Sequence, residues 1–293
     1  MQATDIQQKF LIDSCDVRGQ MVKLCDTWRE AVARVDYPES VRQILGEAFV
    51  ATTLLASTIK FDGRMTLQVR GEGPVHLLVV QISNNGQLRG LARWQAEPAD
   101  SSLPSAFGAD SRMSITIEAK KQGQQYQGIV PLEGESLSEA LQLYFNTSEQ
   151  LPTRLHLAVS DDIAAGMLIQ KLPVEERTAH DEDGWQRAKL LSATISPGEL
   201  CREDPMTLLH RMFHEEQVRV FDSETIVFHC SCSRERTSGM LLGLGEEEVN
   251  SIVQEQGKVE ITCEFCDSVY LYDAVDASAL FKTLGADSDT RLH

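Results

Sequence analysis

Four cysteines near the C-terminus constrain this chain more than any other feature. They form two close pairs, Cys230-Ser231-Cys232 and Cys263-Glu264-Phe265-Cys266, with thirty residues between them. Two such pairs in one small segment suit a tetrahedral Zn²⁺ site with four thiolate ligands. The C-x-C spacing is unusually tight, and it also allows strained, easily reduced disulfides. The spacing leaves two interpretations open: a static zinc knuckle, and a site that alternates between metal and disulfides.

The balance of charge and apolar residues is a second constraint. The chain has 293 residues, 42% of them hydrophobic, and a formal net charge of -17. The apolar content supports a packed core, whereas a nucleic-acid groove needs a basic surface. Residues 1–10 lack a signal-peptide pattern, and no apolar run reaches the ~18 residues of a membrane span. We therefore expect a cytoplasmic protein with neither nucleic acid nor membrane as a partner.

Residues 1–174 predict one α+β domain that combines a sheet platform with helices. Apolar spacing is helical after Pro38 and changes to a period of two from Met65. Asp26 is a candidate N-cap, and Ser136 with Glu139 matches a capping box. The predicted helices cover residues 26–35, 38–59 and 136–148, and the predicted strands cover residues 9–25, 65–70, 75–83, 87–94, 113–119, 125–132, 151–159 and 164–172. We expect the second helix to lie buried across a sheet.

Residues 175–226 predict a helical regulatory linker. The segment begins with a charged stretch at residues 175–184 that has no core pattern. Predicted helices follow at residues 185–195, 197–202 and 205–216, and a predicted hairpin covers residues 217–221 and 225–229. Because proline, glycine and charge interrupt these helices, we expect them to be poorly anchored.

Residues 227–293 predict a small zinc-binding domain. A strand at residues 259–262 delivers the second cysteine pair, and a strand at residues 269–272 returns from it. A domain of this size has little core of its own, so it should depend on its metal for folding. Arg234 and Arg236 could offset the charge of four thiolates, or they could simply begin a solvated helix.

Other potential ligands are less convincing. His210 and His214 share one helix face at a spacing that can bind metal, but no further ligand accompanies them at motif spacing. Ordinary packing is the simpler interpretation of this pair. Cys15, Cys25 and Cys201 have no close partner, and we expect them to be buried small hydrophobes.

The cysteine motifs resemble those of the redox-regulated heat-shock holdase family of bacteria, cytosolic chaperones named for a mass of thirty-three kilodaltons. The resemblance covers the whole chain, and its most specific part is the cysteine signature. The blocks that carry it are Phe228-His229-Cys230-Ser231-Cys232-Ser233-Arg234-Glu235-Arg236, Cys263-Glu264-Phe265-Cys266, Asp36-Tyr37-Pro38, Lys60-Phe61-Asp62-Gly63, Gly71-Glu72-Gly73-Pro74, Tyr126-Gln127-Gly128, Ser148-Glu149-Gln150-Leu151-Pro152-Thr153-Arg154 and His214-Glu215-Glu216. One departure is Thr237, where some members have a further cysteine.

The resemblance implies an ATP-independent chaperone whose partners are unfolding or partially folded client proteins, with no catalytic residue. It implies that Cys230, Cys232, Cys263 and Cys266 hold one Zn²⁺ per chain in a reduced, inactive state. Oxidation would form the disulfides Cys230–Cys232 and Cys263–Cys266, release zinc, and unfold the switch domain and linker. The activated form would be a homodimer that acts under oxidative and heat stress.

Two other classes of protein remain as alternatives. A thiol-disulfide oxidoreductase could use Cys263 and Cys266 catalytically, but a redox C-x-x-C usually stands alone beside a βαβ pattern. A zinc-ribbon nucleic-acid binder is disfavoured by the net charge of -17. Turnover of dithiol substrates would favour the oxidoreductase over the chaperone.

Overall fold

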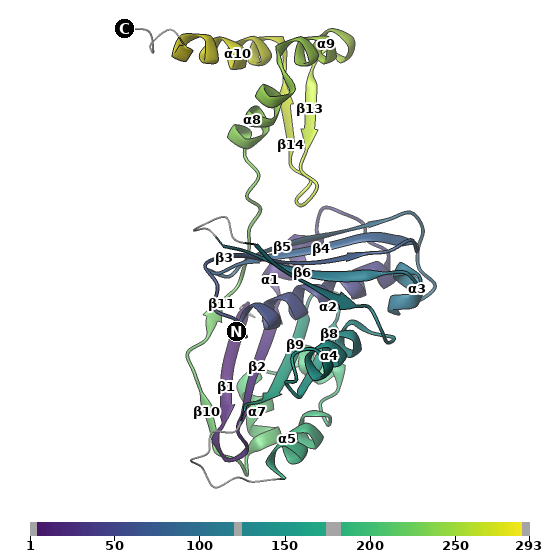
Figure 1. Cartoon of the computed structure of the whole chain (residues 1–293), viewed down its shortest axis with the longest axis vertical. Coiled ribbons are helices and arrows are strands. Elements are labelled where there is room, and N and C mark those ends of the chain that lie inside the picture. The colour runs from purple at the N-terminus through teal and green to yellow at the C-terminus, as the bar shows by residue number, and fades with distance from the viewer. Residues whose placement is uncertain (1–4, 120–124, 174–182, 289–293) are drawn as a thin grey trace. The chain divides into compact units, whose positions relative to one another are not determined.

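The computed structural model describes residues 5–119, 125–173 and 183–288, and the chain divides into two compact units, Met1–His229 and Cys230–His293. The predicted α+β fold class is confirmed (Figure 1). Within the described ranges, no helix combines the length and the apolar character needed to cross a membrane. The charged stretch predicted at residues 175–184 falls largely outside the described residues. The division into platform, linker and switch domain at residues 174 and 226 stays a prediction.

The first unit contains two sheets. Its strands are β1 (Ile6–Ile12), β2 (Val17–Leu24), β3 (Gly63–Arg70), β4 (Val75–Ser83), β5 (Gln87–Trp94), β6 (Arg112–Ala119), β7 (Gln125–Pro131), β8 (Thr153–Val159), β9 (Ala164–Lys171), β10 (Val218–Val220), β11 (Glu224–Thr225) and β12 (Val227–Phe228). Its helices are η1 (Asp13–Cys15), α1 (Asp26–Val32), α2 (Glu39–Ala56), α3 (Leu103–Phe107), α4 (Leu137–Thr147), α5 (Gly184–Ser192), α6 (Pro197–Arg202) and α7 (Pro205–Phe213). Sheet A has the order β10-β1-β2-β9-β8 with β11 beside β1, and sheet B has the order β12-β5-β4-β3-β6-β7. Sheet A is antiparallel throughout, and sheet B is antiparallel except for one parallel pair between β12 and β5.

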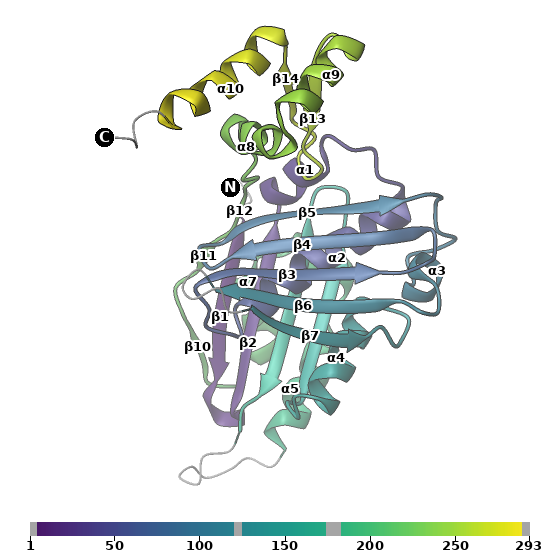
Figure 2. The ribbon, with the colours of Figure 1, turned by 45° about the horizontal axis from the view of Figure 1, so that its top comes forward.

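Helix α2 lies between the two sheets (Figure 2), and the prediction that it is buried across a sheet is confirmed. From Ile44 to Ala56 nearly every residue is buried, because one side of the helix contacts strands of sheet A and the other contacts strands of sheet B. Residues that alternate along sheet B, such as Met65 and Leu67, point into the same core. Their neighbours Thr66 and Gln68 therefore lie on the opposite, open face.

The linker helices α5, α6 and α7 pack against the other face of sheet A, so the expectation that they are poorly anchored is wrong for this state. Strand β9 is buried on both faces: Leu168 faces the core around α2, whereas Met167 and Ile169 face the linker helices. The helices contribute an apolar stripe to this second core, made of Ala188, Leu200, Cys201, Leu208, Leu209, Met212 and Phe213, and Ile195 joins it from the segment between α5 and α6. The charged residues between these apolar positions made the stripe difficult to recognise in the sequence.

Residues 218–228 form a strap that joins both sheets, and the predicted hairpin here is wrong. Strands β10 and β11 pair with β1 in sheet A, whereas β12 pairs in parallel with β5 in sheet B. Between them, Ile226 is 2% exposed and belongs to the core around α2. The amide of His229 then donates to the Leu88 carbonyl at 3.0 Å, immediately before the first cysteine. The chain is therefore held to both sheets up to Cys230.

Two predicted helix caps differ in the structure. Asp26 is the first residue of α1 and makes no cap, because Cys25 occupies the N-cap position. The buried carboxylate of Asp5 caps the helix instead, accepting from the amide of Cys25 and from the amide and hydroxyl of Thr27. At α4, Ser136 is the N-cap as predicted, but Glu139 accepts from Glu135 rather than completing a capping box.

Helix α3 had no predicted counterpart, because five residues give too short a pattern. It explains two glycines in the turn between β3 and β4. A Cβ at Gly71 would lie 2.1 Å from the Phe107 carbonyl oxygen, and the amide of Gly73 donates to that oxygen at 2.9 Å. Only glycine allows the turn to approach α3 this closely.

The second unit is small and surrounds one antiparallel hairpin. Its elements are α8 (Arg234–Leu244), α9 (Glu246–Gln256), β13 (Val259–Thr262), β14 (Val269–Tyr272) and α10 (Ala274–Ser288). The buried cluster described here has six members: Leu241, Val249, Val253, Val259, Tyr272 and Ala277. The Tyr272 hydroxyl contacts the hydroxyl of buried Thr237 at 2.5 Å, so Thr237 packs against this core.

Candidate metal centre

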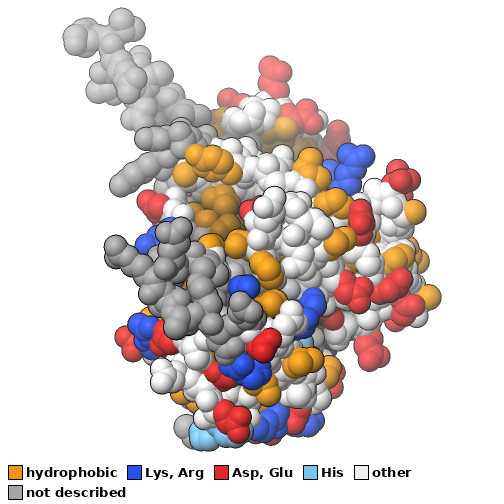
Figure 3. Space-filling view, turned by 60° about the horizontal axis from the view of Figure 1, so that its bottom comes forward, with side chains coloured by type: hydrophobic (Ala, Val, Ile, Leu, Met, Phe, Trp, Pro, Cys, Tyr) orange, Lys and Arg blue, Asp and Glu red, His pale blue; other side chains and the backbone are white. Residues whose placement is uncertain are grey.

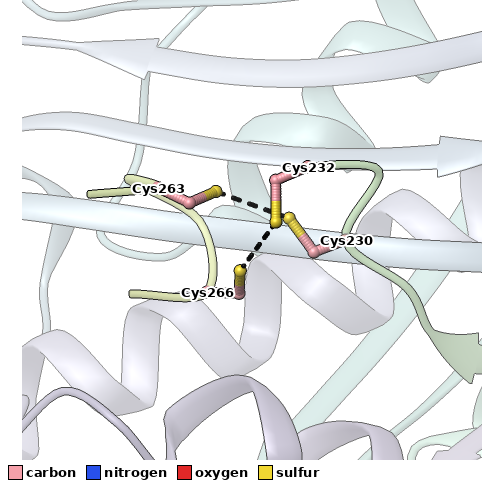
Figure 4. A group of neighbouring side chains, drawn as sticks. All are labelled: Cys230, Cys232, Cys263 and Cys266. Carbon is pink, nitrogen blue, oxygen red and sulfur yellow. Dashed lines mark hydrogen bonds between the residues drawn. The ribbon is translucent and has the colours of Figure 1, made fainter. Parts of the chain in front are cut away.

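The two cysteine pairs meet at one point of the second unit (Figure 4). Cys230 and Cys232 lie in the segment between β12 and α8, and Cys263 and Cys266 lie in the turn between β13 and β14. The turn is closed by hydrogen bonds from the Cys263 amide to the Ser268 carbonyl and from the Asp267 amide to the Cys263 carbonyl. The hairpin therefore fixes one pair, and the irregular segment before α8 carries the other pair to it.

The sulfur atoms have the spacing of a shared cation. All four Sγ atoms lie within 4.8 Å of one another. Cys230 Sγ lies 3.6 Å from Cys263 Sγ, and Cys232 Sγ lies 3.3 Å from Cys266 Sγ. A tetrahedral Zn²⁺ with bonds of ~2.3 Å places its sulfurs about 3.8 Å apart, whereas a disulfide bond is ~2.05 Å. Four soft thiolates at these distances fit a zinc-type site, and the four cysteines are free thiols.

The thiols differ in their ease of ionisation. Desolvation, together with hydrogen bonding to the other thiols, raises the pKa of Cys230 to about 12, and desolvation also raises the pKa of Cys263. Burial acts in the same direction on Cys266, but hydrogen bonds from the side chain and backbone of Ser268 outweigh it and lower its pKa to about 6. A cluster of thiolates without a cation is mutually repulsive, so a bound metal ion would favour ionisation of all four.

The two arginines that follow the first pair have separate roles. The guanidinium of Arg236 donates to the carbonyl and hydroxyl of Ser231, which stands between Cys230 and Cys232. Arg234 instead forms an ion pair with Asp276 at 2.8 Å and lies 4.3 Å from the centre of the Tyr272 ring. Arg236 is thus the one that braces the first pair, whereas Arg234 ties α8 to α10.

Sequence reasoning missed two residues that contact the sulfurs. The Tyr270 hydroxyl lies 3.2 Å from Cys232 Sγ, and the Ser268 hydroxyl lies 3.2 Å from Cys266 Sγ. The hydrogen bond to Cys232 raises the pKa of Tyr270 to about 12. Hydroxyls placed this way can donate to metal-bound thiolates. Their position shortly after the second pair was the available signal, because the returning strand passes beside the sulfurs.

The remaining candidate ligands lie elsewhere. His210 and His214 stack on the exposed side of α7 with ring centres 6.3 Å apart, and among the described residues only the four cysteines form a cluster of metal-binding groups. Cys15, Cys25 and Cys201 are buried in the first unit, as expected. Desolvation raises the pKa of each of these three thiols, which favours the inert protonated form.

A four-thiol centre on a small unit, joined to a larger two-sheet α+β unit, defines a class of protein with a structural metal-type site. Comparisons with known proteins give the family. The model of the Hsp33 protein family matches residues 5–273. The chain belongs to the Hsp33 family, and it is a chaperone by that membership.

Curated relatives and a solved structure agree with this assignment. A protein of Pseudomonas fluorescens named 33 kDa chaperonin is 44% identical, with 98% of both chains covered. Relatives of the same name from Shewanella loihica and Chromobacterium violaceum are 44% and 43% identical, covering 95% and 94% of this chain and 96% and 94% of theirs. The crystal structure of the 33 kDa chaperonin from Thermotoga maritima has the same fold, with a TM-score of 0.82 at 23% identity, covering 97% of this chain and 100% of that one.

Proposed function

We propose that this protein is an ATP-independent holdase that binds unfolding proteins when its four-cysteine centre is oxidised. The observation that carries the proposal is the convergence of Cys230, Cys232, Cys263 and Cys266 within 4.8 Å on a unit with very little core. In the reduced state these residues would hold one Zn²⁺ and the protein would be inactive. Oxidation would release the metal, and the activated chain would act as a homodimer in the cytoplasm.

The metal would contribute most of the stability of the second unit. Six buried residues form its described core, and one of them is an alanine. Structural zinc contributes ~10–16 kcal/mol to the folding of small zinc domains, whereas full burial of one large apolar side chain contributes ~1.5–3 kcal/mol. Loss of the metal should therefore unfold this unit, and the thiolates that bind it are also the atoms that oxidants attack.

The surface offered to clients would be the apolar face of sheet A together with the inner faces of the linker helices. Phe10, Met21 and Met167 lie on this sheet face and are covered by helices that include Met212 and Phe213. An exposed apolar patch of this kind is what a protein needs to bind unfolded chains. Release of α5, α6 and α7 would expose both sides of the buried cluster at once.

The expected disulfides are Cys230–Cys232 and Cys263–Cys266, although two close sulfur contacts in the folded unit, Cys230–Cys263 and Cys232–Cys266, join one pair to the other. The partners within a pair stay close in an unfolded chain, whereas the partners of different pairs are 33 or 34 residues apart. Closing a loop of that length costs entropy, so local pairing is favoured once the unit unfolds. Disulfide mapping would therefore report whether oxidation follows or precedes unfolding.

The experiment compares metal content, free thiols and aggregation suppression before and after oxidation. The reduced protein should carry one zinc per chain and suppress aggregation of an unfolding client poorly. After peroxide with mild heat it should lose zinc and four thiols, and it should suppress aggregation without ATP. Light scattering that shows equal suppression in both states would overturn the proposal.

Matched variants separate the centre from thiol loss in general. Cys263→Ser should lose zinc and the folded structure of the second unit, whereas Cys25→Ala removes a buried thiol of the first unit and should keep both. The oxidoreductase alternative predicts turnover of dithiol substrates that depends on Cys263 and Cys266. We expect no such turnover.

A further inference from the structure

Two arginines face each other on the open side of sheet B. Arg70 on β3 is directly opposite Arg112 on β6 in the antiparallel pairing. Side chains at such positions have Cβ atoms about 4.5–5.5 Å apart, and like charges there are destabilising. Within the described part of the chain, neither guanidinium forms an ion pair or a hydrogen bond. Neither of the two positive charges is therefore paired directly with a carboxylate in the described residues.

The two arginines also line a hollow of about 330 Å³. Gln68, Ser114 and Gln127 provide amide and hydroxyl groups along its floor. Residues in β3 and β6 alternate between the core and this face, so Gln68 and Ser114 occupy the same side of the sheet as the arginines. Hollows of ~300–1,000 Å³ are the size range of small-molecule sites. The hollow therefore has room for a small polar ligand.

Arg64 lies on the same face of sheet B but outside the hollow, and unlike Arg70 and Arg112 it has side-chain partners. Arg64 lies 3.8 Å from the Glu118 carboxylate and 3.3 Å from the Gln81 side-chain oxygen. The net charge of -17 does not predict where single basic side chains lie; on the face that Figure 3 shows, acidic and basic side chains are interspersed.

We propose that this hollow binds a small phosphate-bearing ligand. Guanidinium groups present two parallel donors each, and two of them match the charge and the oxygens of one phosphate dianion. Gln68 and Ser114 can donate further hydrogen bonds to its oxygens. Ile129 lines the same hollow and is 64% exposed, so it offers an apolar wall to the group that carries the phosphate. The site is independent of the cysteine centre and of the proposed holdase activity.

The charges in the hollow predict effects of opposite sign. Glu72 and Asp110 also line it, and their carboxylates should repel an anion. Removing either arginine should therefore weaken binding, whereas Glu72→Gln should strengthen it. A non-specific electrostatic attraction to the whole face would instead respond equally to any arginine on it.

The test is a titration of the reduced, zinc-loaded full chain with phenyl phosphate, followed by NMR chemical shifts at low salt. We expect saturable binding with a Kd of about 1 mM or tighter, and weakening by about tenfold or more in Arg70→Gln and in Arg112→Gln. Arg64→Gln is the matched control and should change the Kd by less than about twofold. Ile129→Ser should weaken binding of phenyl phosphate more than binding of inorganic phosphate.

Three outcomes would overturn the proposal. Shifts that do not saturate would show that the hollow holds no ligand of this class. An equal loss in Arg64→Gln would show a general charge effect rather than a site. Benzoate binding as tightly as phenyl phosphate would show that the hollow does not select phosphate over carboxylate.

Discussion

Truncation of Phe213 should activate the protein without removing its metal. Phe213 lies on α7, is 1% exposed, and has its ring centre 6.1 Å from that of Phe10 on sheet A. Replacing a buried phenylalanine by alanine costs ~3–5 kcal/mol of stability, because the protein loses the burial of the removed ring atoms and is left with a cavity. The loss falls on the contact between the linker helices and the sheet, whereas Phe213→Ala alters none of the four cysteines.

That cost is large compared with the net stability of a docked segment. The helices gain free energy from the buried cluster, but they lose most of it to the entropy of ordering the linker. A penalty of ~3–5 kcal/mol shifts the docking equilibrium by roughly a hundredfold to several-thousandfold. We therefore expect a substantial undocked population of α5, α6 and α7 in reduced Phe213→Ala at moderate temperature.

The assay combines hydrogen exchange with client binding. Amides of the linker helices should lose protection while those of α2 stay protected, and zinc content and free thiols should equal those of the wild type. Light scattering should then show suppression of client aggregation without oxidant. Leu190→Ala is the control, because Leu190 is on α5 but 67% exposed, and its truncation should cost less than ~0.5 kcal/mol.

Two results would refute this reasoning. If the helices exchange rapidly but the client still aggregates, the surface beneath them is not the client-binding surface. If protection of the helices is unchanged, the cluster does not hold them in place. A milder variant, Phe213→Leu, keeps most of the buried volume and should give an intermediate response. If Phe213→Ala also loses protection in α2, the first unit as a whole is destabilised, and the same measurements are made on Phe213→Leu instead.

Two further predictions concern the first unit. Burial raises the pKa of Glu47 to about 6 despite a hydrogen bond from Gln43. The stability that comes from this raised pKa is therefore fully present below about pH 4.5 and is lost as the pH rises through 6. In urea unfolding, Glu47→Gln should be more stable than the wild type by about 2 kcal/mol at pH 7.5 and equal to it at pH 4. Asp5→Ala should lower the free energy of unfolding by about 2 kcal/mol, because three hydrogen-bond donors at the start of α1 lose their acceptor. The control Asp26→Ala should cost less than ~0.5 kcal/mol. Equal effects of the two substitutions would contradict the observed cap.

Features with a local cause could be predicted from the sequence. Pro38 and the apolar run that follows it predicted α2 and its burial, and the period of two predicted the strands of both sheets. The spacing of Cys230, Cys232, Cys263 and Cys266 predicted that these thiols converge, because C-x-C and C-x-x-C turns can present pairs of sulfurs to one ion.

Features with a distant cause could not be predicted. Asp5 caps a helix that begins at Asp26, and no local pattern links the two. The strands at residues 218–228 have the alternation of a hairpin, yet each finds a better partner in an existing sheet edge. Arg70 and Arg112 are likewise brought together only by the register of β3 and β6.

The strap at residues 218–228 determines how metal loss could reach the linker helices. Ile226 is buried and β12 is paired with β5, so the strap is held by the first unit. Unfolding of the second unit should therefore stop at Cys230 and should not spread directly into the strap. The linker helices beyond it bury their own cluster against sheet A and gain nothing directly from the metal. Loss of zinc should thus unfold the second unit but leave the helices docked until a second input, such as heat, weakens the strap and the cluster. The proposed switch is then a response to two stresses, because the oxidant acts on the sulfurs and temperature acts on the apolar contacts.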